Sequence, residues 1–515
     1  MDLVLKGGRV LTEGGLVDAS VLIKDDRIAA VVPAASKTPL RGDDVLNCKG
    51  LVVAPGLVDA HSHDDVAVRK PEFYEAKIRQ GVTTTTIGMD GLGYAPIPAE
   101  HAKSIVQYWQ PVDGNPGFLV SASIAKQVRS YEGGIGLNVI LHAPHANFRI
   151  AETGFENRQL SSDQLTRAQN GVATALEQGA LGLTTGLSYV PAVFSTFEEL
   201  LRLTRPLVAS SLPYISHLRS YGLDIFRAVD EAVRLGEALN IPIHISHLHL
   251  SHPQMFGRAA ELLDHLQRAI QRGIRVTWDL YPYSAGSSIL HSYLPTWLTE
   301  GGPSRLVSRL TDPQEVQQLA NDPEFASFDW TKVVISSTAT GRHIGQSVDD
   351  IANEHHLATA EAVAQLLTAE NLRVSCLVHQ TDSKDDDMLA TADEAIVGSD
   401  GLPFGQKPHP RCYAAFPAFY DRYVRQLSQM TLDQALRKMS TQSADLYGLT
   451  ERGRIRPTAK ADLMIFDPDR YTPMATYEEP RRFAGGVHHV LVNGKIVLRG
   501  GMFNASLKAG EVVIR

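Results

Sequence analysis

The stretch that decides the fold is Pro55-Gly56-Leu57-Val58-Asp59-Ala60-His61-Ser62-His63, which follows the apolar run Leu51-Val52-Val53. A short strand that ends on two histidines two residues apart places both imidazoles on one face. Imidazole nitrogens are good ligands for zinc and neighbouring metals. The pair can therefore hold one metal ion whose remaining positions are open for an activated water molecule.

The middle of the chain alternates between helical patterns and short β-branched runs. This alternation predicts a parallel sheet covered by helices. The polar residues that end such strands gather at one mouth, where barrel enzymes keep their active sites. The helical patterns cover 163–178, 224–239, 257–272 and 359–369, and the β-branched runs cover 81–87, 241–245, 274–278 and 395–397.

Both ends of the chain differ from the middle because they are rich in hairpin signals. Asn493-Gly494 separates two apolar runs within 490–497, which is a strong hairpin pattern. Short apolar runs also occur near the N-terminus, within 2–32. Residues 284–340 interrupt the alternation and are interpreted as an insertion and candidate lid.

Composition excludes several classes of protein. The chain has 515 residues, 43% hydrophobic and 21% charged, and a net charge of −8, which disfavours binding to nucleic acid or to an anionic membrane. No apolar run reaches the ~18 residues of a membrane span, and no signal peptide is recognised. Three scattered cysteines do not make a disulfide framework, so the expected compartment is the cytoplasm.

Further polar residues end strand-like segments elsewhere. Asp90 follows the run 82–87, His217 and His247 each end an Ile-Ser-His segment, and Asp400 follows Ile396-Val397. Taken singly, each is more often a turn aspartate or a structural histidine. Together with the first histidine pair they favour a metal site at a barrel mouth. An aspartate at the last strand can also take a proton from water and pass it to a leaving group.

At this point the chain resembles the amidohydrolase superfamily and, within it, the D-aminoacylase (N-acyl-D-amino-acid deacylase) family. The resemblance implies a (β/α)₈ barrel over residues 55–454 and a small β-sandwich built from 1–54 plus 455–515. The motifs that carry it are Pro-Gly-Leu-Val-Asp-Ala-His-Ser-His-Asp-Asp at 55–65, Gln-Gly-Val-Thr-Thr at 80–84, the stretch 177–189, Ser-His-Leu at 246–248, Tyr-Pro-Tyr-Ser-Ala-Gly-Ser at 281–287, Gly-Ser-Asp-Gly-Leu-Pro at 398–403, Pro-His-Pro-Arg at 408–411 and Ala-Asp-Leu-Met at 461–464.

The resemblance also implies how the metal ligands divide. His61, His63 and Asp400 form one position, and His217 and His247 belong to a second, tighter one. The family has a cysteine thiolate where this chain has Asp90, which can bridge two ions through its two oxygens or not ligate at all. A carboxylate is a harder ligand, so one or two Zn²⁺ ions are the first choice but Mn²⁺, Co²⁺ or Fe²⁺ are admitted.

The substrate-binding residues are also implied, with departures from the family. A family lysine that holds the substrate's α-carboxylate is replaced by His249, which is charged only part of the time. Arg219 is a candidate replacement, since a guanidinium can clasp a carboxylate. His145 lies in a loop that has lost the family's glycines and could face the substrate or only shape the loop. The remaining candidates are Tyr189, Tyr281, Tyr283 and Ser287.

The expected function is metal-dependent hydrolysis of N-acyl-D-amino acids or closely related acyl amides, with Asp400 as general base and acid. One alternative is a hydantoinase-like enzyme that opens a cyclic amide; Thr184 and Thr185 stand where such an enzyme would need a strand-borne lysine. The other alternative is a non-catalytic scaffold of the same fold, which would carry no stoichiometric metal. The expected partner is a small-molecule substrate, and the oligomeric state stays open.

Overall fold

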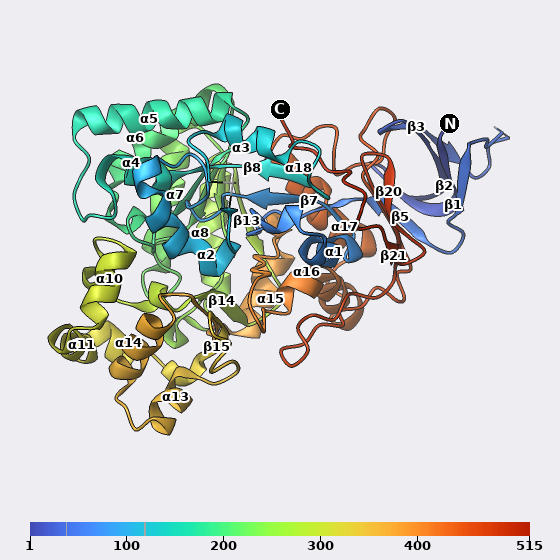
Figure 1. Cartoon of the computed structure of the whole chain (residues 1–515). Coiled ribbons are helices and arrows are strands. Elements are labelled where there is room, and N and C mark those ends of the chain that lie inside the picture. The colour runs from blue at the N-terminus through green and yellow to red at the C-terminus, as the bar shows by residue number, and fades with distance from the viewer. Residues whose placement is uncertain (38, 118–119) are drawn as a thin grey trace.

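A closed barrel of parallel strands lies at the centre of the computed structural model, which describes residues 1–37, 39–117 and 120–515 (Figure 1). A six-stranded sheet and a three-stranded sheet make up its wall. The sheets join where the Ala60 amide donates to the carbonyl oxygen of Val397 at 3.2 Å. Strands β8 and β9 are separated only by His142, so they form one interrupted strand of a (β/α)₈ barrel. The predicted fold class is confirmed.

The barrel strands are short and buried on both faces, as expected for a parallel sheet enclosed by helices. In β7, for example, all six residues of Val82–Ile87 are buried. The strands are β6 (Leu57–Val58), β7 (Val82–Ile87), β8 (Asn138–Leu141), β9 (Ala143–Pro144), β10 (Leu183–Gly186), β11 (Tyr214–His217), β12 (Ile243–Ile245), β13 (Val276–Leu280) and β17 (Ala395–Val397).

Amphipathic helices cover the outside of the barrel. The helix α5 begins with a capping box, in which Ser161 and Gln164 bond each other's backbone amides. Helix α7 buries an apolar stripe that includes Val229 and Val233, which are 4 residues apart and therefore share one face. The surrounding helices include α1 (Pro71–Arg79), α5 (Ser162–Glu177), α6 (Phe197–Thr204), α7 (Ile225–Leu239), α8 (Ala259–Gln271), α15 (Ser383–Thr391) and α17 (Leu432–Met439).

The two chain ends meet in a nine-stranded sheet beside the barrel (Figure 1). Its centre is β5, which pairs with β1 on one side and with β18 on the other. The Asn493-Gly494 turn joins β19 and β20, and both turn residues have positive φ, as this hairpin type requires. The strands are β1 (Leu3–Thr12), β2 (Gly15–Lys24), β3 (Arg27–Pro33), β4 (Asp44–Asn47), β5 (Val52–Pro55), β18 (Leu463–Phe466), β19 (Val487–Val492), β20 (Lys495–Arg499) and β21 (Met502–Phe503).

An inserted unit with its own hydrophobic core follows β13 and lies at the bottom of Figure 1. Strand β16 (Val374–His379) pairs with both β14 (Ala285–Ile289) and β15 (Val333–Thr338), so the unit continues beyond residue 340. The helical pattern at 359–369 is therefore α14 of this unit and does not cover the barrel. Its helices are α9 (Thr296–Thr299), α10 (Pro303–Leu310), α11 (Pro313–Ala320), α12 (Pro323–Ser327), α13 (Val348–Glu354) and α14 (Thr359–Ala369).

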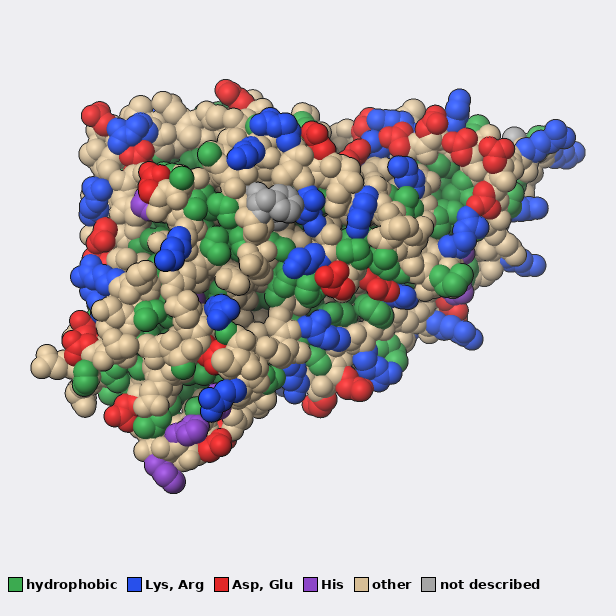
Figure 2. Space-filling view, in the orientation of Figure 1, with side chains coloured by type: hydrophobic (Ala, Val, Ile, Leu, Met, Phe, Trp, Pro, Cys, Tyr) green, Lys and Arg blue, Asp and Glu red, His purple; other side chains and the backbone are tan. Residues whose placement is uncertain are grey.

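The surface carries charges of both signs. On the face shown in Figure 2, Lys and Arg side chains are interspersed with Asp and Glu. None of the helices in the described part of the chain combines the length and the apolar character needed to cross a bilayer.

Candidate metal centre

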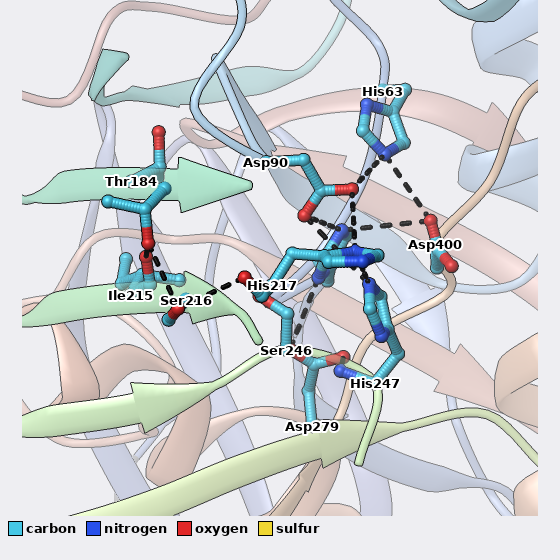
Figure 3. Close-up of polar contacts among 12 residues, drawn as sticks. His63, Asp90, Thr184, Ile215, Ser216, His217, Ser246, His247, Asp279 and Asp400 are labelled. Carbon is cyan, nitrogen blue, oxygen red and sulfur yellow. Dashed lines mark hydrogen bonds and ion pairs between the residues drawn. The ribbon is translucent and has the colours of Figure 1, made fainter. Parts of the chain in front are cut away.

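Four histidines and two aspartates converge at the carboxyl ends of the barrel strands (Figure 3). They come from segments far apart in the sequence, and the barrel alone brings them together. His61 and His63 follow β6, Asp90 follows β7, His217 ends β11, His247 follows β12 and Asp400 follows β17.

Three of these residues have an unusual backbone conformation. The φ angles are +53° at Asp90, +34° at His247 and +46° at Asp400. Residues other than glycine seldom adopt positive φ, and when they do the site is often functional. Each of these residues lies just after a strand, where the chain turns abruptly from the barrel wall.

Asp90 lies among all four imidazoles, three of which, His63, His217 and His247, are labelled in Figure 3. Its Oδ1 is 3.6 Å from Nε2 of His61 and 3.8 Å from Nε2 of His247. Its Oδ2 is 3.7 Å from Nε2 of His63 and 3.7 Å from Nδ1 of His217. Each oxygen of the carboxylate therefore faces one histidine of the first pair, His61 and His63, and one of the second pair, His217 and His247.

Asp400 faces the first pair of histidines. Its Oδ1 is 3.3 Å from Nε2 of His63 and 3.6 Å from Nε2 of His61. Barrel closure fixes this position, because the Asp400 amide donates to the carbonyl oxygen of His61 at 2.8 Å. Two sets of potential ligands result: His61, His63 and Asp400, and His61, Asp90 and His247.

The ligand atoms of these two sets are better placed to bind a shared metal ion than to form hydrogen bonds with one another. His61 Nε2 and Asp90 Oδ1 are buried and have no hydrogen-bond partner within the described chain. Their separation of 3.6 Å is too long for a hydrogen bond. Ligands about 2.1 Å from a tetrahedral zinc ion lie about 3.4 Å apart, close to the separations observed here. A shared cation would satisfy both atoms.

Electrostatics favour a cation at this place. Burial by itself lowers the pKa of His61, but the carboxylates of Asp279, Asp90 and Asp400 raise it to about 10. Burial lowers the pKa of His217, although Asp90 opposes this effect. A neutral imidazole is the form that binds metal. The centre thus combines excess negative charge with at least one histidine kept neutral.

Asp279 on β13 contacts three histidines, two of which are predicted metal ligands, and sequence reasoning missed it. Its Oδ2 lies 3.3 Å from Nδ1 of His61 and 2.9 Å from Nε2 of His244, and its Oδ1 accepts from the His247 amide at 2.9 Å. Carboxylates in this place orient a ligating imidazole. The sequence does contain a signal for Asp279. A charged residue inside the mostly apolar strand Val276–Leu280 is costly to bury unless it has partners, so its presence there indicates that it has them.

Arg411 is a second residue that sequence reasoning did not assign. Its Nη2 lies 2.9 Å from Oδ2 of Asp400 and donates to the carbonyl oxygen of Ser287 at 3.3 Å. Its guanidinium lies 4.3 Å from the ring centroid of Tyr281. The side chain is fully buried, and its Nε and Nη1 have no hydrogen-bond partner in the described residues. A buried cation with free donors beside a cavity is suited to an anionic group.

A partly open cavity of about 70 Å³ lies above the ligands. Most of the predicted substrate-facing residues line it, together with apolar residues from α2 (Ala102–Asp113) and from the inserted unit. The predicted residues on its wall are His63, Asp90, Tyr189, His217, His247, His249, Tyr281, Ser287 and Asp400.

Three predicted substrate residues do not line this cavity. Arg219 is bound by Glu231 at 3.1 Å and donates to backbone carbonyls, so its guanidinium is already occupied. His145 begins α4 (His145–Thr153) and lies 3.5 Å from Glu199 inside the protein. Tyr283 packs its ring against His409, with centroids 5.1 Å apart. The structure removes Arg219 as the replacement for the family lysine.

His249, which stands in place of that lysine, is held as a neutral group. Its ring stacks on Tyr221 at a centroid distance of 4.6 Å, and its Nδ1 lies 2.5 Å from the carbonyl oxygen of His247. Burial, followed by the nearby His247, lowers the pKa of His249 to about 3. This residue therefore supplies no positive charge to the cavity at neutral pH.

Several known proteins are similar to this chain in sequence and in fold. Residues 346–498 match the profile of the "Amidohydrolase family". The chain is 30% identical to a D-aminoacylase of Alcaligenes xylosoxydans xylosoxydans over 100% of this chain and 98% of that protein, and 29% identical to an N-acyl-D-glutamate deacylase of the same organism over 96% and 93%. A structure of N-acyl-D-glutamate deacylase from Bordetella bronchiseptica, complexed with zinc and a phosphonate mimic of the tetrahedral intermediate, superposes with a TM-score of 0.86 at 28% identity and covers 100% of both chains.

A barrel whose strand ends present these histidines and aspartates is the architecture of an amidohydrolase. The sequence identity to deacylases over the whole chain assigns it to one family within this class. The chain belongs to the D-aminoacylase (N-acyl-D-amino-acid deacylase) family of the amidohydrolase superfamily.

Proposed function

We propose that this protein is a metal-dependent deacylase that hydrolyses N-acyl-D-amino acids to a carboxylate and a free D-amino acid. The observation that carries the proposal is the convergence of four imidazoles and two carboxylates at the mouth of a barrel, beneath a cavity that most of these residues line. The family membership of the chain gives the substrate class.

The ligands we assign are His61, His63, Asp90, His217, His247 and Asp400. When bound there, a divalent metal polarises the amide carbonyl and makes water acidic enough to supply hydroxide at neutral pH. Zinc is the first choice because imidazoles dominate the set. The carboxylate of Asp90, in place of a thiolate, admits Mn²⁺, Co²⁺ and Fe²⁺ as well.

Asp400 serves as the proton carrier. Arg411 holds Oδ2 at 2.9 Å, while Oδ1 faces the imidazoles at 3.3 and 3.6 Å. Burial raises the pKa of Asp400, but the charges of Arg411 and His61 outweigh this and lower it, so the carboxylate is ionised at neutral pH. In this form it accepts a proton from the attacking water. It then returns that proton to the nitrogen of the departing amine.

We assign binding of the substrate's α-carboxylate to Arg411, Tyr281 and Ser287. Arg411 offers Nε and Nη1, which have no partner among the described residues, and the other two line the cavity beside it. A guanidinium can hold a carboxylate through two hydrogen bonds and so orient the scissile amide. His249 contributes a neutral imidazole and Tyr189 a hydroxyl to the same wall.

The compartment we assign is the cytoplasm. Its support is that Cys48, Cys376 and Cys412 are free and buried, which suits a reducing environment.

The test is a release assay on metal-free protein supplied separately with Zn²⁺, Mn²⁺ or Co²⁺. Paired N-acetyl-D- and N-acetyl-L-amino acids and a set of hydantoins serve as substrates. We expect metal-dependent release of D-amino acids and little turnover of the L-series or of the rings. Ring opening in preference to deacylation would support a cyclic-amide hydrolase, and absence of stoichiometric metal would support a scaffold.

A further inference from the structure

The cavity above the candidate ligands has an apolar wall that the proposed chemistry does not use. We define this wall as Trp109, Val112, Ile289, Tyr293 and Leu402. Trp109 and Val112 lie on α2, and Ile289 ends β14. The wall begins directly beside the metal ligands, because the Trp109 and His63 rings lie 5.7 Å apart. A substrate bound at the ligands must place one of its groups against this wall.

Among the described residues that line the cavity, none is a lysine or an arginine. Its charged lining residues, Asp90 and Asp400, are acidic. Arg411 lies behind the lining residues Asp400 and Ser287; its Nη2 is engaged by Asp400, and its free donors can serve one carboxylate.

We propose that the amino-acid side chain of the substrate is uncharged and packs on the apolar wall, and that D-glutamyl and D-aspartyl substrates are rejected. This inference rests on the proposed deacylase function and names the substrate class within it. A D-glutamyl or D-aspartyl substrate brings two carboxylates. The first takes Arg411, and the second would be buried against aromatic and aliphatic side chains without a basic side chain as a partner.

The experiment compares substrates that have the same shape and differ in charge. N-acetyl-D-glutamine is set against N-acetyl-D-glutamate, and N-acetyl-D-asparagine against N-acetyl-D-aspartate, on the metal-loaded holoenzyme. We expect kcat/KM to be at least about 100-fold higher for each amide, because an unpaired buried charge costs several kcal/mol. N-acetyl-D-leucine and N-acetyl-D-methionine should be turned over faster than either amide.

A charge-supplying variant tests the cause of the preference. Gln380 lines the cavity and is similar in length to lysine. In Gln380→Lys we expect the glutamine-to-glutamate ratio of kcat/KM to fall by about tenfold or more, as for a new close charge pair. The matched control, Gln380→Met, keeps the length without the charge and should leave the ratio as in the wild type. Metal content and unfolding temperature identify a misfolded variant, and Ser288→Lys then takes its place.

The outcomes separate this inference from the function on which it rests. Equal or faster hydrolysis of the D-glutamyl or D-aspartyl substrate overturns the uncharged-substrate inference but leaves the deacylase function intact. A ratio that Gln380→Lys leaves unchanged, in a folded and metal-loaded variant, also overturns it. Failure to hydrolyse any N-acyl-D-amino acid, neutral or acidic, removes the deacylase function itself.

Discussion

Nδ1 of His217 lies 3.0 Å from Nε2 of His247, although 30 residues separate the two histidines in the chain. Strands β11 and β12 are neighbours in the barrel, and each histidine lies at the carboxyl end of its strand. This separation fits a hydrogen bond through one shared proton. Both nitrogen atoms also face the carboxylate of Asp90, at 3.7 and 3.8 Å, so a metal ion that displaces the proton would have Asp90 as a neighbouring ligand.

Removal of His217 is expected to prevent metal binding at the position that His217 shares with His247. In His217→Ala, bound metal should fall and turnover should drop to about 1% of wild type or less, since loss of an outer-shell partner alone typically costs 10–100-fold. Metal analysis of the purified protein and the release assay measure the two effects. His355→Ala, on an exposed histidine of the inserted unit, is the control. Unchanged metal content in His217→Ala would remove this residue from the site.

Asp90 is expected to set the metal preference. A thiolate is softer than a carboxylate, so Asp90→Cys should raise the Zn²⁺:Mn²⁺ occupancy ratio by roughly tenfold or more when both ions compete. Asp90→Asn keeps the side-chain volume without the charge and should weaken binding of both ions. Elemental analysis after dialysis against an equimolar mixture gives the ratios. If Asp90→Cys and the wild type load alike, Asp90 is not a ligand.

Asp279 is expected to act through His61 and His247 without touching the substrate. In Asp279→Asn, metal affinity should fall by about 10–100-fold, because Nδ1 of His61 loses the carboxylate that orients it. Thr277→Val is the matched control, since it removes the 2.8 Å contact to Nδ1 of His244 and leaves His61 alone. Competition with a chelator measures both affinities. Equal losses in the two variants would argue for a general packing defect.

Arg411 is expected to recognise the α-carboxylate. Arg411→Gln should lower kcat/KM for N-acetyl-D-leucine by roughly 100-fold or more, since it removes a buried charged partner. An N-acetylated amine that lacks the carboxylate should lose much less. Arg411→Lys, which keeps the charge but not the planar fork, should be intermediate. A similar loss on both substrates would place the role of Arg411 in its contact with Asp400 alone.

Glu199 on α6 is expected to make stability depend on acid pH. Burial raises the pKa of Glu199, but the hydrogen bond and charge of His145, and then Arg149, lower it from 4.5 to about 2. A lowered folded-state pKa contributes stability above the unfolded value of 4.5, and that contribution is lost as the pH falls towards 2. At neutral pH it amounts to roughly 3 kcal/mol.

The measurement is the thermal unfolding midpoint of wild type and Glu199→Gln from about pH 7 down to about pH 3. The gap between the two proteins should be widest at neutral pH and should narrow below about pH 4.5. Glu132→Gln, on an exposed glutamate, is the control and should show little gap at any pH. A gap that stays constant with pH would mean that Glu199 is held by packing and not by charge.

Much of the fold could be predicted because its signals are local. The Asn493-Gly494 turn, the β-branched run at 82–87 and the amphipathic stretch at 225–239 each determine their own element. The helical stretch at 359–369 was also predicted as a helix but belongs to the inserted unit. Periodicity shows that a helix has an apolar face, and it does not show which core that face covers.

The sequence by itself determined that strand-like segments end on the six candidate ligands, His61, His63, Asp90, His217, His247 and Asp400. The reason is that the alternation of side chains along a strand, and the chemistry of each residue, depend only on neighbouring residues in the chain. Only the tertiary structure decided that Asp90 lies among all four imidazoles, that Asp279 supports His61, and that Arg219 binds Glu231 and does not reach the cavity. Those outcomes depend on barrel closure and on left-handed turns after the strands, which fix side-chain directions through contacts between residues hundreds of positions apart.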